Sequence, residues 1–285
     1  MQIKNKTTMK EPVRVLFVNS EIFPYMPEST MSLIGRYLPQ GIQEAGKEIR
    51  SFMPRYGCIN ERRNQLHEVI RLSGMNIVIN NLDRPLVIKV SSIPSARMQV
   101  YFIDNEDYFH RKFVYEDAEG NFIEDNDERA AFFARGILET VKKLRWKPDI
   151  IHCHGWISHL LPLYLKKAYK NDPIFTDCKV VLSIYDDHLN CRFSPEMKTK
   201  ILMPGVKAKD IEPLSGTDGI NLAKLAISYS DAIIQCTETP CPELAAFIEE
   251  RGLPVLGYTD TRQPEGEYIK VYNGFYDKIL DNNVN

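Results

Sequence analysis

Short apolar runs alternate with amphipathic stretches along most of this chain, and this alternation is the feature that most limits its fold. Residues 13–19 form an apolar run, residues 30–46 have the character of a helix, and residues 47–53 return as a strand. The same order of elements recurs later, with a helix predicted at 127–144 and a strand at 150–154. Strands that alternate with helices in this way pair in parallel. The sequence therefore predicts an α/β fold, a parallel sheet with helices on both faces.

Two signals mark the first helix. Ser29 or Thr30 is suited to cap its N-terminus, because a side-chain oxygen there accepts a hydrogen bond from a free backbone N–H. Pro39 has no N–H to donate, so we expect the helix to bend or divide near it. The later elements follow the same alternation. We predict helices at residues 157–169, 220–228 and 242–251, and strands at 179–185, 231–235 and 268–272.

Two stretches depart from the alternation. Residues 75–103 contain apolar runs, two of them rich in β-branched residues, with a turn at 81–85. This pattern predicts a β-hairpin excursion. Residues 104–128 hold ten acidic residues against only Arg111 and Lys112. A charge run of this kind is typical of a solvated loop.

Composition excludes several classes of function. The 285 residues include 36 Lys and Arg against 38 Asp and Glu, a formal net charge of −2, so no basic excess points to a nucleic-acid partner. No apolar stretch approaches the roughly 20 residues of a membrane span, and the polar start of the chain does not resemble a signal peptide. The six cysteines form no C-x-x-C pair. We expect a reduced, cytoplasmic protein.

A group of histidines ends the strand predicted at 150–154. His152 and His154 share one face of that strand, while Cys153 points to the other, and His159 follows nearby. Structural zinc sites usually draw four ligands from spacings such as C-x2-C or H-x3–5-H, and no carboxylate is placed here as a partner, so we predict no metal. The G-x-G-x-x-G fingerprint of NAD and FAD sites is absent after the first strand, and we predict no cofactor. The ends of parallel strands are nevertheless where open α/β sheets bind ligands.

Several motifs follow one another in a fixed order along the chain. They are Ser20-Glu21 and Phe23-Pro24 after the first strand, Leu38-Pro39 in the first helix, Pro54-Arg55-Tyr56-Gly57 after the next strand, and Trp146-Lys147-Pro148-Asp149-Ile150-Ile151-His152-Cys153-His154-Gly155-Trp156. In spacing and order these motifs resemble the bacterial glycogen synthases and plant starch synthases. The resemblance extends over about residues 13–280.

The resemblance implies a fold, a reaction and a division of roles. The family builds two Rossmann-like domains that face each other across a cleft, the GT-B arrangement, and transfers glucose from ADP-glucose to an α-1,4-glucan. Its N-terminal half binds the acceptor glucan, and its C-terminal half holds most of the nucleotide contacts. By this resemblance residues 13–280 form the N-terminal, acceptor-side domain, and residues 1–12 and 281–285 form tails. We expect the C-terminal nucleotide-binding domain to be absent.

The chain departs from the family pattern where the family handles the sugar donor. The family's Lys-x-Gly-Gly loop is replaced by residues 26–30, in which Pro27 removes an N–H and Glu28 adds a negative charge. The family's Asp-Trp-His reads Gly155-Trp156-Ile157, and its Val-His-Asn reads Ile184-Tyr185-Asp186. We therefore predict no catalytic residue and no independent glucosyl transfer.

Three roles stay open for such a chain. It could bind α-glucan or a partner protein without catalysis, or it could be the acceptor-side subunit of a split synthase completed by a separate C-terminal-domain chain. It could also be a sugar- or nucleotide-binding module with different chemistry. The vacated face further predicts a homo-oligomer. The candidate ligand-binding residues are Glu21, Tyr25, Ser29, Tyr56, His154, Trp156, Tyr185 and Asp186, of which the four aromatic ones are expected to be exposed in the cleft.

Overall fold

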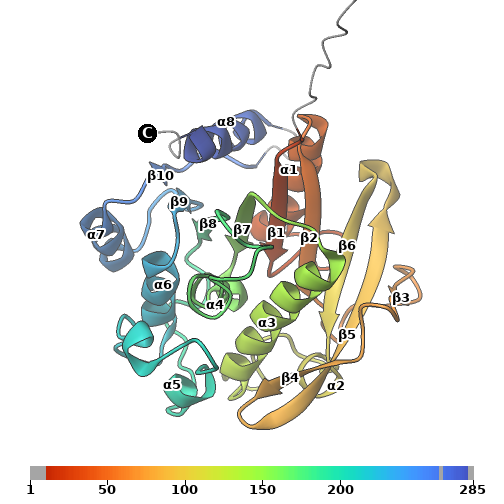
Figure 1. The fold of residues 1–285 in the computed structure, drawn as a ribbon, viewed down its shortest axis with the longest axis vertical. Coiled ribbons are helices and arrows are strands. Elements are labelled where there is room, and N and C mark those ends of the chain that lie inside the picture. Colours follow the sequence, from red (N-terminus) through yellow and green to blue (C-terminus); the bar gives the residue numbers. More distant parts are fainter. Residues whose placement is uncertain (1–10, 263–265, 282–285) are drawn as a thin grey trace, which may run out of the picture.

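A computed structural model describes residues 11–262 and 266–281, and its centre is one twisted sheet (Figure 1). The tails predicted at 1–12 and 281–285 lie almost wholly outside these residues. The strands are β1 Arg14–Asn19, β2 Glu48–Pro54, β3 His67–Glu68, β4 Met75–Ile79, β5 Leu82–Ile93, β6 Met98–Asp104, β7 Ile150–His154, β8 Lys179–Ile184, β9 Ala232–Gln235 and β10 Val255–Leu256. The helices are α1 Thr30–Glu44, α2 Glu106–Phe109, α3 Asn126–Leu144, α4 Leu161–Lys167, α5 Met197–Lys200, α6 Gly219–Ser228, α7 Pro242–Arg251 and α8 Tyr268–Asp281, with 3-10 turns η1 Pro94–Ala96, η2 Trp156–Ser158 and η3 Ala208–Ile211.

The strands are ordered β10-β9-β8-β7-β1-β2-β6-β5-β3, and β4 pairs with β5 outside this path. All pairs from β10 to β6 are parallel, whereas β5 runs antiparallel to β6, β3 and β4. In the centre of the sheet, Val15 of β1 lies between Ile49 of β2 and Ile150 of β7. The predicted α/β sheet is confirmed, and hairpin strands lie in the stretch 75–103. The turn predicted at 81–85 falls at residues 80–81 instead, because residues 82–85 already pair with β4.

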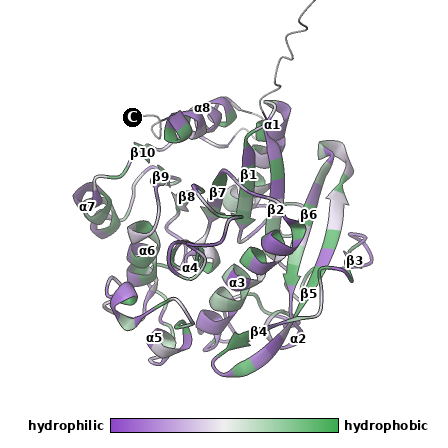
Figure 2. Cartoon of the chain, viewed as in Figure 1, coloured by the Kyte–Doolittle hydropathy of each residue, from purple (hydrophilic) through white to green (hydrophobic). Residues whose placement is uncertain are grey.

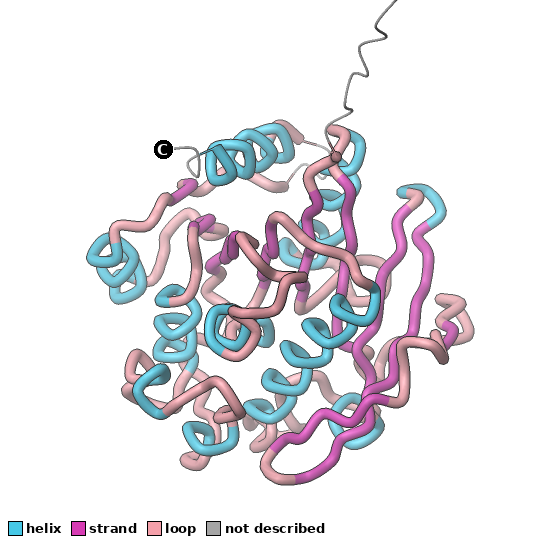
Figure 3. Tube along the Cα trace, viewed as in Figure 1, coloured by secondary structure: helices cyan, strands magenta, loops and turns pink. Residues whose placement is uncertain are grey.

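Helices cover both faces of the sheet. On one face, α1 and α8 pack against Val15, Phe17 and Val181. On the other face, α3, α4 and α6 enclose the larger core. Buried apolar side chains thus lie on both sides of the central strands, as expected of a parallel sheet. Figure 3 shows that the connection between β8 and α6 runs mostly as loop, interrupted by short helical turns.

Helix α8 corrects the strand predicted at 268–272. Its buried residues are Tyr268, Tyr272, Phe275, Tyr276 and Ile279, which follow the period of a helix rather than of a strand. Figure 2 shows hydrophobic and hydrophilic residues side by side along α8, as expected of a helix that covers a sheet with one face only. A five-residue window was too short to show this period.

Three smaller predictions also need correction. Helix α1 continues through Pro39 without dividing. The helix expected at 157–169 is the turn η2 followed by the shorter α4. The acidic segment 104–128 is not simply a solvated loop, because it includes α2 and buries Tyr108, Phe109 and Tyr115. The segment also buries the carboxylates of Asp104, Asp127 and Glu128.

No helix in the described parts of the chain combines the length and apolar character that a membrane crossing requires.

Candidate functional site

The carboxyl ends of β1, β7 and β8 meet at one edge of the sheet. Asn19 of β1 is level with His154 of β7, and His154 is level with Ser183 of β8. The loops that follow these strands therefore start side by side. They contain most of the residues predicted to bind a ligand, and we call this region the strand-end site.

The loop after β1 is fixed by its own contacts. Ser29 caps α1, since its Oγ accepts from the N–H of Ser32 at 3.0 Å. The Ser29 hydroxyl also donates to Glu21 Oε2 at 2.9 Å. Pro27 and Glu28 are exposed between these two anchors. The loop thus presents a carboxylate outward at the place where the sequence predicts a lost lysine, and the predicted N-cap at Ser29 is confirmed.

Gly155 is held against the loop after β1. The N–H and the hydroxyl of Ser20 both donate to the carbonyl of His154, at 2.9 and 3.0 Å. Gly155 has φ of +81°, and a Cβ placed on it would lie 2.2 Å from Ser20 Oγ. No side chain fits this position while Ser20 stays where it is. The aspartate of the family pattern could not occupy residue 155 in this structure.

Tyr185 occupies the space in front of His154. Its hydroxyl lies 3.0 Å from His154 Nδ1, and both side chains are buried. Burial lowers the pKa of His154 to about 3, so the imidazole is neutral at physiological pH. Burial likewise raises the pKa of Tyr185 well above its usual value. His154 Nε2 is buried and has no hydrogen-bond partner among the described residues. That nitrogen is one of the buried polar atoms in this region that a water or a ligand could satisfy.

His152 has a structural role in the same network. Its Nδ1 lies 2.6 Å from the hydroxyl of Tyr276 on α8, and its Nε2 lies 2.8 Å from Ser183 Oγ. Burial, with a smaller contribution from His154, lowers the pKa of His152 well below its usual value. Both ring nitrogens are committed to hydroxyl groups. The pair of histidines is therefore a neutral, hydrogen-bonded element that joins the sheet to α8.

The aromatic residues expected in an open cleft are buried instead. Trp156 is only 1% exposed, and the rings of Tyr115, Phe122 and Phe193 lie 5.0, 5.2 and 5.6 Å from it. The other three are buried as well: Tyr25 donates to Ser91 Oγ, Tyr56 donates to the carbonyl of Ser20, and Tyr185 contacts His154. Loops distant in sequence cover these side chains. The expectation of exposed aromatic residues at these four positions is wrong.

Asp187 is not among the predicted ligand-binding residues, yet its carboxylate contacts the turn that follows β7. Its Oδ2 accepts from the backbone N–H of Trp156 at 3.1 Å, and its Oδ1 is buried without a partner among the described residues. Burial raises the pKa of Asp187 to about 7, and the charges of Glu21 and Asp186 act in the same direction. Asp186 itself is exposed. An aspartate pair after a strand gives no sign in sequence of which carboxyl turns inward.

A groove of about 550 Å³ adjoins the site between the loop after β8 and the turn around Gly120. Asp186 is the one predicted ligand-binding residue that lines it. The remaining polar and aromatic lining includes Glu116, Asn121, Phe122, His188 and Arg192. Amide, carboxylate and guanidinium groups beside aromatic rings suit a polyhydroxylated ligand, because they offer both hydrogen bonds and a stacking surface.

Within the described residues, one group of potential metal ligands comprises Glu61, Asp104 and His110, away from the strand-end site. The ammonium of Lys89 lies 2.6 Å from Glu61 Oε1 and 2.8 Å from Asp104 Oδ2. Arg55 also contacts Glu61. These cations compensate the carboxylates, so the group is an ion-pair network.

Comparisons with known proteins agree on the family. A family model described as the starch synthase catalytic domain matches residues 14–254. Glycogen synthase of Chlorobium limicola is 41% identical over 264 residues, which cover 88% of this chain and 53% of that protein. Glycogen synthase of Chlorobium chlorochromatii is 34% identical over 276 residues, covering 94% and 55% respectively. The chain thus spans about half the length of the curated relatives it matches.

A solved structure supports the fold. The catalytic domain of starch synthase IV from Arabidopsis thaliana, bound to ADP and acarbose, matches with a TM-score of 0.70 at 16% identity. The match covers 88% of this chain and 52% of that one. The sheet and its helices therefore have the arrangement of one half of a starch synthase catalytic domain.

Proposed function

Because the chain belongs to the starch synthase catalytic-domain family, we propose that it serves the acceptor side of glucan metabolism and does not transfer glucose by itself. In this role it binds α-glucan in the groove that adjoins the strand-end site. Family membership supports a glycogen or starch synthase-like glycosyltransferase scaffold. The absence of independent transfer is inferred from the geometry of the site.

One observation carries the proposal. Three contacts made by the chain's own side chains lie at or beside the positions where the chain departs from the family pattern. Ser20 closes the space beside Gly155, Tyr185 hydrogen-bonds His154, and Ser29 ties Glu21 to the start of α1. A ligand that entered would have to displace these contacts. The chain's own hydrogen bonds therefore favour a closed state without a donor.

The negative charge of the loop after β1 also disfavours a nucleotide-sugar donor. Glu21 and Glu28 stand on the loop after β1, and the described part of that loop offers no lysine or arginine. A carboxylate about 4 Å from one charge of a diphosphate costs roughly 4 kcal/mol at an effective dielectric near 20. A neutral glucan does not meet this repulsion. The electrostatics thus favour a neutral sugar polymer over a nucleotide sugar.

A second candidate role is that of the acceptor-side subunit of a split synthase, and it is suggested by the length of the relatives. The glycogen synthases of Chlorobium limicola and Chlorobium chlorochromatii are each about twice as long as the part that this chain matches. Glucosyl transfer by this chain would then require a polypeptide that supplies the remaining half. The observation that favours this role is the match itself, which covers one half of each relative.

Glycogen affinity tests the proposed binding. Asp186→Ala removes an exposed carboxylate from the groove and should weaken retardation of the native protein in glycogen-containing gels by about 3- to 10-fold in apparent Kd, as expected for one hydrogen-bonding group. Asp83→Ala, an exposed aspartate on β5, is the matched control and should leave retardation unchanged. Equal mobility of wild type with and without glycogen would contradict the proposal.

A further inference from the structure

A second hollow of about 270 Å³ adjoins the groove beside the strand-end site. Leu189, Asn190 and Arg192 line both cavities, so the two meet along the segment 189–192, which we call the ridge. The turn around Gly120 forms the far wall of the groove, and the first turns of α6 and α7 form the far wall of the second hollow. The other residues that line the second hollow are Asp218, Ile220, Asn221 and Glu243.

Backbone hydrogen bonds hold the ridge against the loop that leads into α6. The N–H of Ile220 donates to the carbonyl of Leu189, and the N–H of Gly219 donates to the carbonyl of Cys191, both at 3.1 Å. The two segments approach closely at Gly219, where a Cβ would lie 2.1 Å from the carbonyl oxygen of His188. The ridge is therefore a preformed surface, which lowers the entropy cost of binding a ligand.

Two polar side chains on the ridge are available to a ligand. Asn190 and Arg192 are exposed, and neither has a hydrogen bond or ion pair with another described residue. An amide both donates and accepts hydrogen bonds, and a guanidinium donates several in one plane, so each can pair with neighbouring hydroxyl groups of a sugar. Because both side chains line both cavities, a ligand that crosses the ridge meets them along its middle.

The second hollow adds further groups that suit a polyhydroxylated ligand. Glu243 accepts from Lys224 Nζ through Oε1 at 2.7 Å, and its other oxygen has no partner among the described residues. Ile220 offers an apolar surface beside it. Asn221 is already committed, since its amide donates to the carboxylate of Asp218. Glu243 is thus the residue of the second hollow with free hydrogen-bonding capacity.

The charges along the two cavities favour a neutral ligand. Glu116 and Asp186 line the groove, Asp218 and Glu243 line the second hollow, and Arg192 is the only arginine or lysine that lines either. An excess of carboxylates repels phosphorylated and acidic chains. A neutral glucan does not meet this repulsion.

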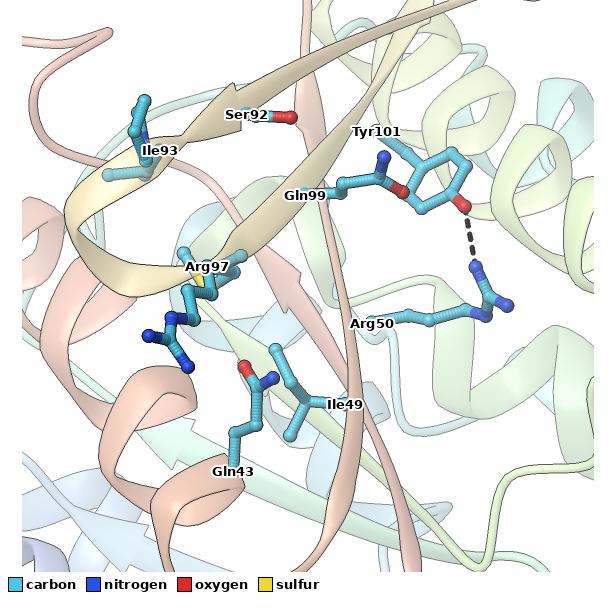
Figure 4. Close-up of a pocket in the computed structure, with 10 residues that line it drawn as sticks. Gln43, Ile49, Arg50, Ser92, Ile93, Arg97, Gln99 and Tyr101 are labelled. Atoms are coloured by element: carbon cyan, nitrogen blue, oxygen red, sulfur yellow. Dashed lines mark hydrogen bonds between the residues drawn. The ribbon is translucent and has the colours of Figure 1, made fainter.

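A cavity of about 410 Å³ at the start of β2 and β6 does not extend the groove, because it lies at the opposite end of the sheet (Figure 4). Its side chains also diverge. Figure 4 shows Arg50 directed to the Tyr101 hydroxyl, with Arg97 and Gln43 on the other side of β2. The groove and the second hollow, in contrast, share the residues of the ridge.

We propose that a linear α-glucan segment lies across the ridge and occupies both cavities. Asn190 and Arg192 contact its middle, and Glu243 contacts the part that enters the second hollow. The proposal rests on the glucan binding proposed above and adds the length of chain that the site recognises. A chain too short to cross the ridge occupies one cavity and lacks the contacts of the other. Affinity therefore rises with chain length until both cavities are filled.

Calorimetric titration with maltose and maltoheptaose at millimolar concentrations tests this proposal. We expect maltoheptaose to bind about 10-fold more tightly or better, because it gains the hydrogen bonds of the second hollow. Glu243→Ala should weaken maltoheptaose binding by about 3- to 10-fold and leave maltose binding unchanged. Asp186→Ala, in the larger groove, should weaken the binding of both sugars. Glu250→Ala is the matched control, since this exposed glutamate of α7 lines neither cavity, and it should bind like wild type.

The outcomes separate this proposal from the glucan binding on which it rests. Equal affinity of wild type for the two sugars, unchanged maltoheptaose binding in Glu243→Ala, or an equal loss in Glu250→Ala would overturn the extended site and leave glucan binding in the groove intact. If wild type bound neither sugar, both proposals would fail.

Discussion

Single residues decide what the strand-end site can accept. Gly155 follows β7 in a backbone conformation that L side chains rarely adopt, and its neighbour Ser20 fills the space where a side chain would project. Tyr185 satisfies His154 Nδ1 and leaves Nε2 without a partner. The residues that replace the family pattern are thus packed into the structure, and reverting one of them alone would not restore the family's site.

Gly155→Ala tests this packing. The added Cβ would lie 2.2 Å from Ser20 Oγ, and the backbone conformation itself is costly for alanine, so we expect a loss of about 2–4 kcal/mol in the free energy of unfolding. Gly252→Ala is the matched control, because its φ is also positive but nothing lies within 4 Å of the added Cβ. It should lose only about 1 kcal/mol. Equal losses in urea denaturation would show that Ser20 does not close the site.

The raised pKa of Asp187 predicts that the free energy of unfolding depends on pH. Its pKa is about 7 in the folded protein and about 3.9 in an unfolded chain, so between these values the folded state binds more protons. Its contribution to the free energy of unfolding therefore falls as pH rises from 4 to 7. Asp187→Asn keeps an acceptor for the Trp156 N–H and removes this dependence.

We expect Asp187→Asn to gain stability relative to wild type between pH 5 and pH 8, by about 1–2 kcal/mol, since partial exposure reduces the full effect of the shift. Other titrating groups cancel in the difference, including His154, which acts in the opposite sense below pH 6.5. Urea denaturation of both proteins at pH 5 and at pH 8 measures this difference in stability. A constant difference between variant and wild type would mean that Asp187 is ionised throughout this range.

At the level of elements, α8 is joined to the sheet by polar as well as apolar contacts. Tyr276 reaches His152, Tyr272 approaches Cys236, and Lys47 before β2 contacts Asn273 and Asp277. The helix lies outside the family match, which ends at residue 254. It buries five side chains on the α1 face of the sheet. These side chains share one buried cluster with Phe17, Val181 and the apolar face of α1.

Tyr276→Phe isolates the polar part of that attachment. It removes the hydroxyl that lies 2.6 Å from His152 Nδ1 and leaves the nitrogen buried without a partner. We expect a loss of about 1–3 kcal/mol in the free energy of unfolding. Tyr258→Phe, which changes an exposed tyrosine, should cost less than about 0.5 kcal/mol. A neutral effect of Tyr276→Phe would mean that water replaces the hydroxyl.

At the scale of the whole molecule, local sequence features predicted where several strands and helices lie, but not which side chains pack over the strand-end site. The strand at 150–154 and the helix at 242–251 have the predicted bounds, because a short apolar run and a Pro at the helix start are local features. The burial of Trp156 could not be predicted, since Tyr115 and Phe122 reach it from the loop before α3 and Phe193 reaches it from the loop after β8. The inward turn of Asp187 depends in the same way on the backbone of η2.

The extent of the match to the relatives also concerns the whole molecule, because it bears on the family's reaction. The chain matches about half of each curated relative, and the matched half contains the sheet whose strand ends form the site. A fold supports many chemistries, so activity has to be argued from the site. Here the site is closed by its own side chains and carries negative charge on the loop after β1.

Glucosyl incorporation from labelled ADP-glucose into glycogen tests the central claim most directly. The purified chain should give no incorporation above a protein-free background, while glycogen synthase of Chlorobium limicola run in parallel serves as the positive control. The same preparation should be retarded by glycogen in a native gel, which shows that it is folded and binds. Incorporation by the purified chain above background would contradict the account.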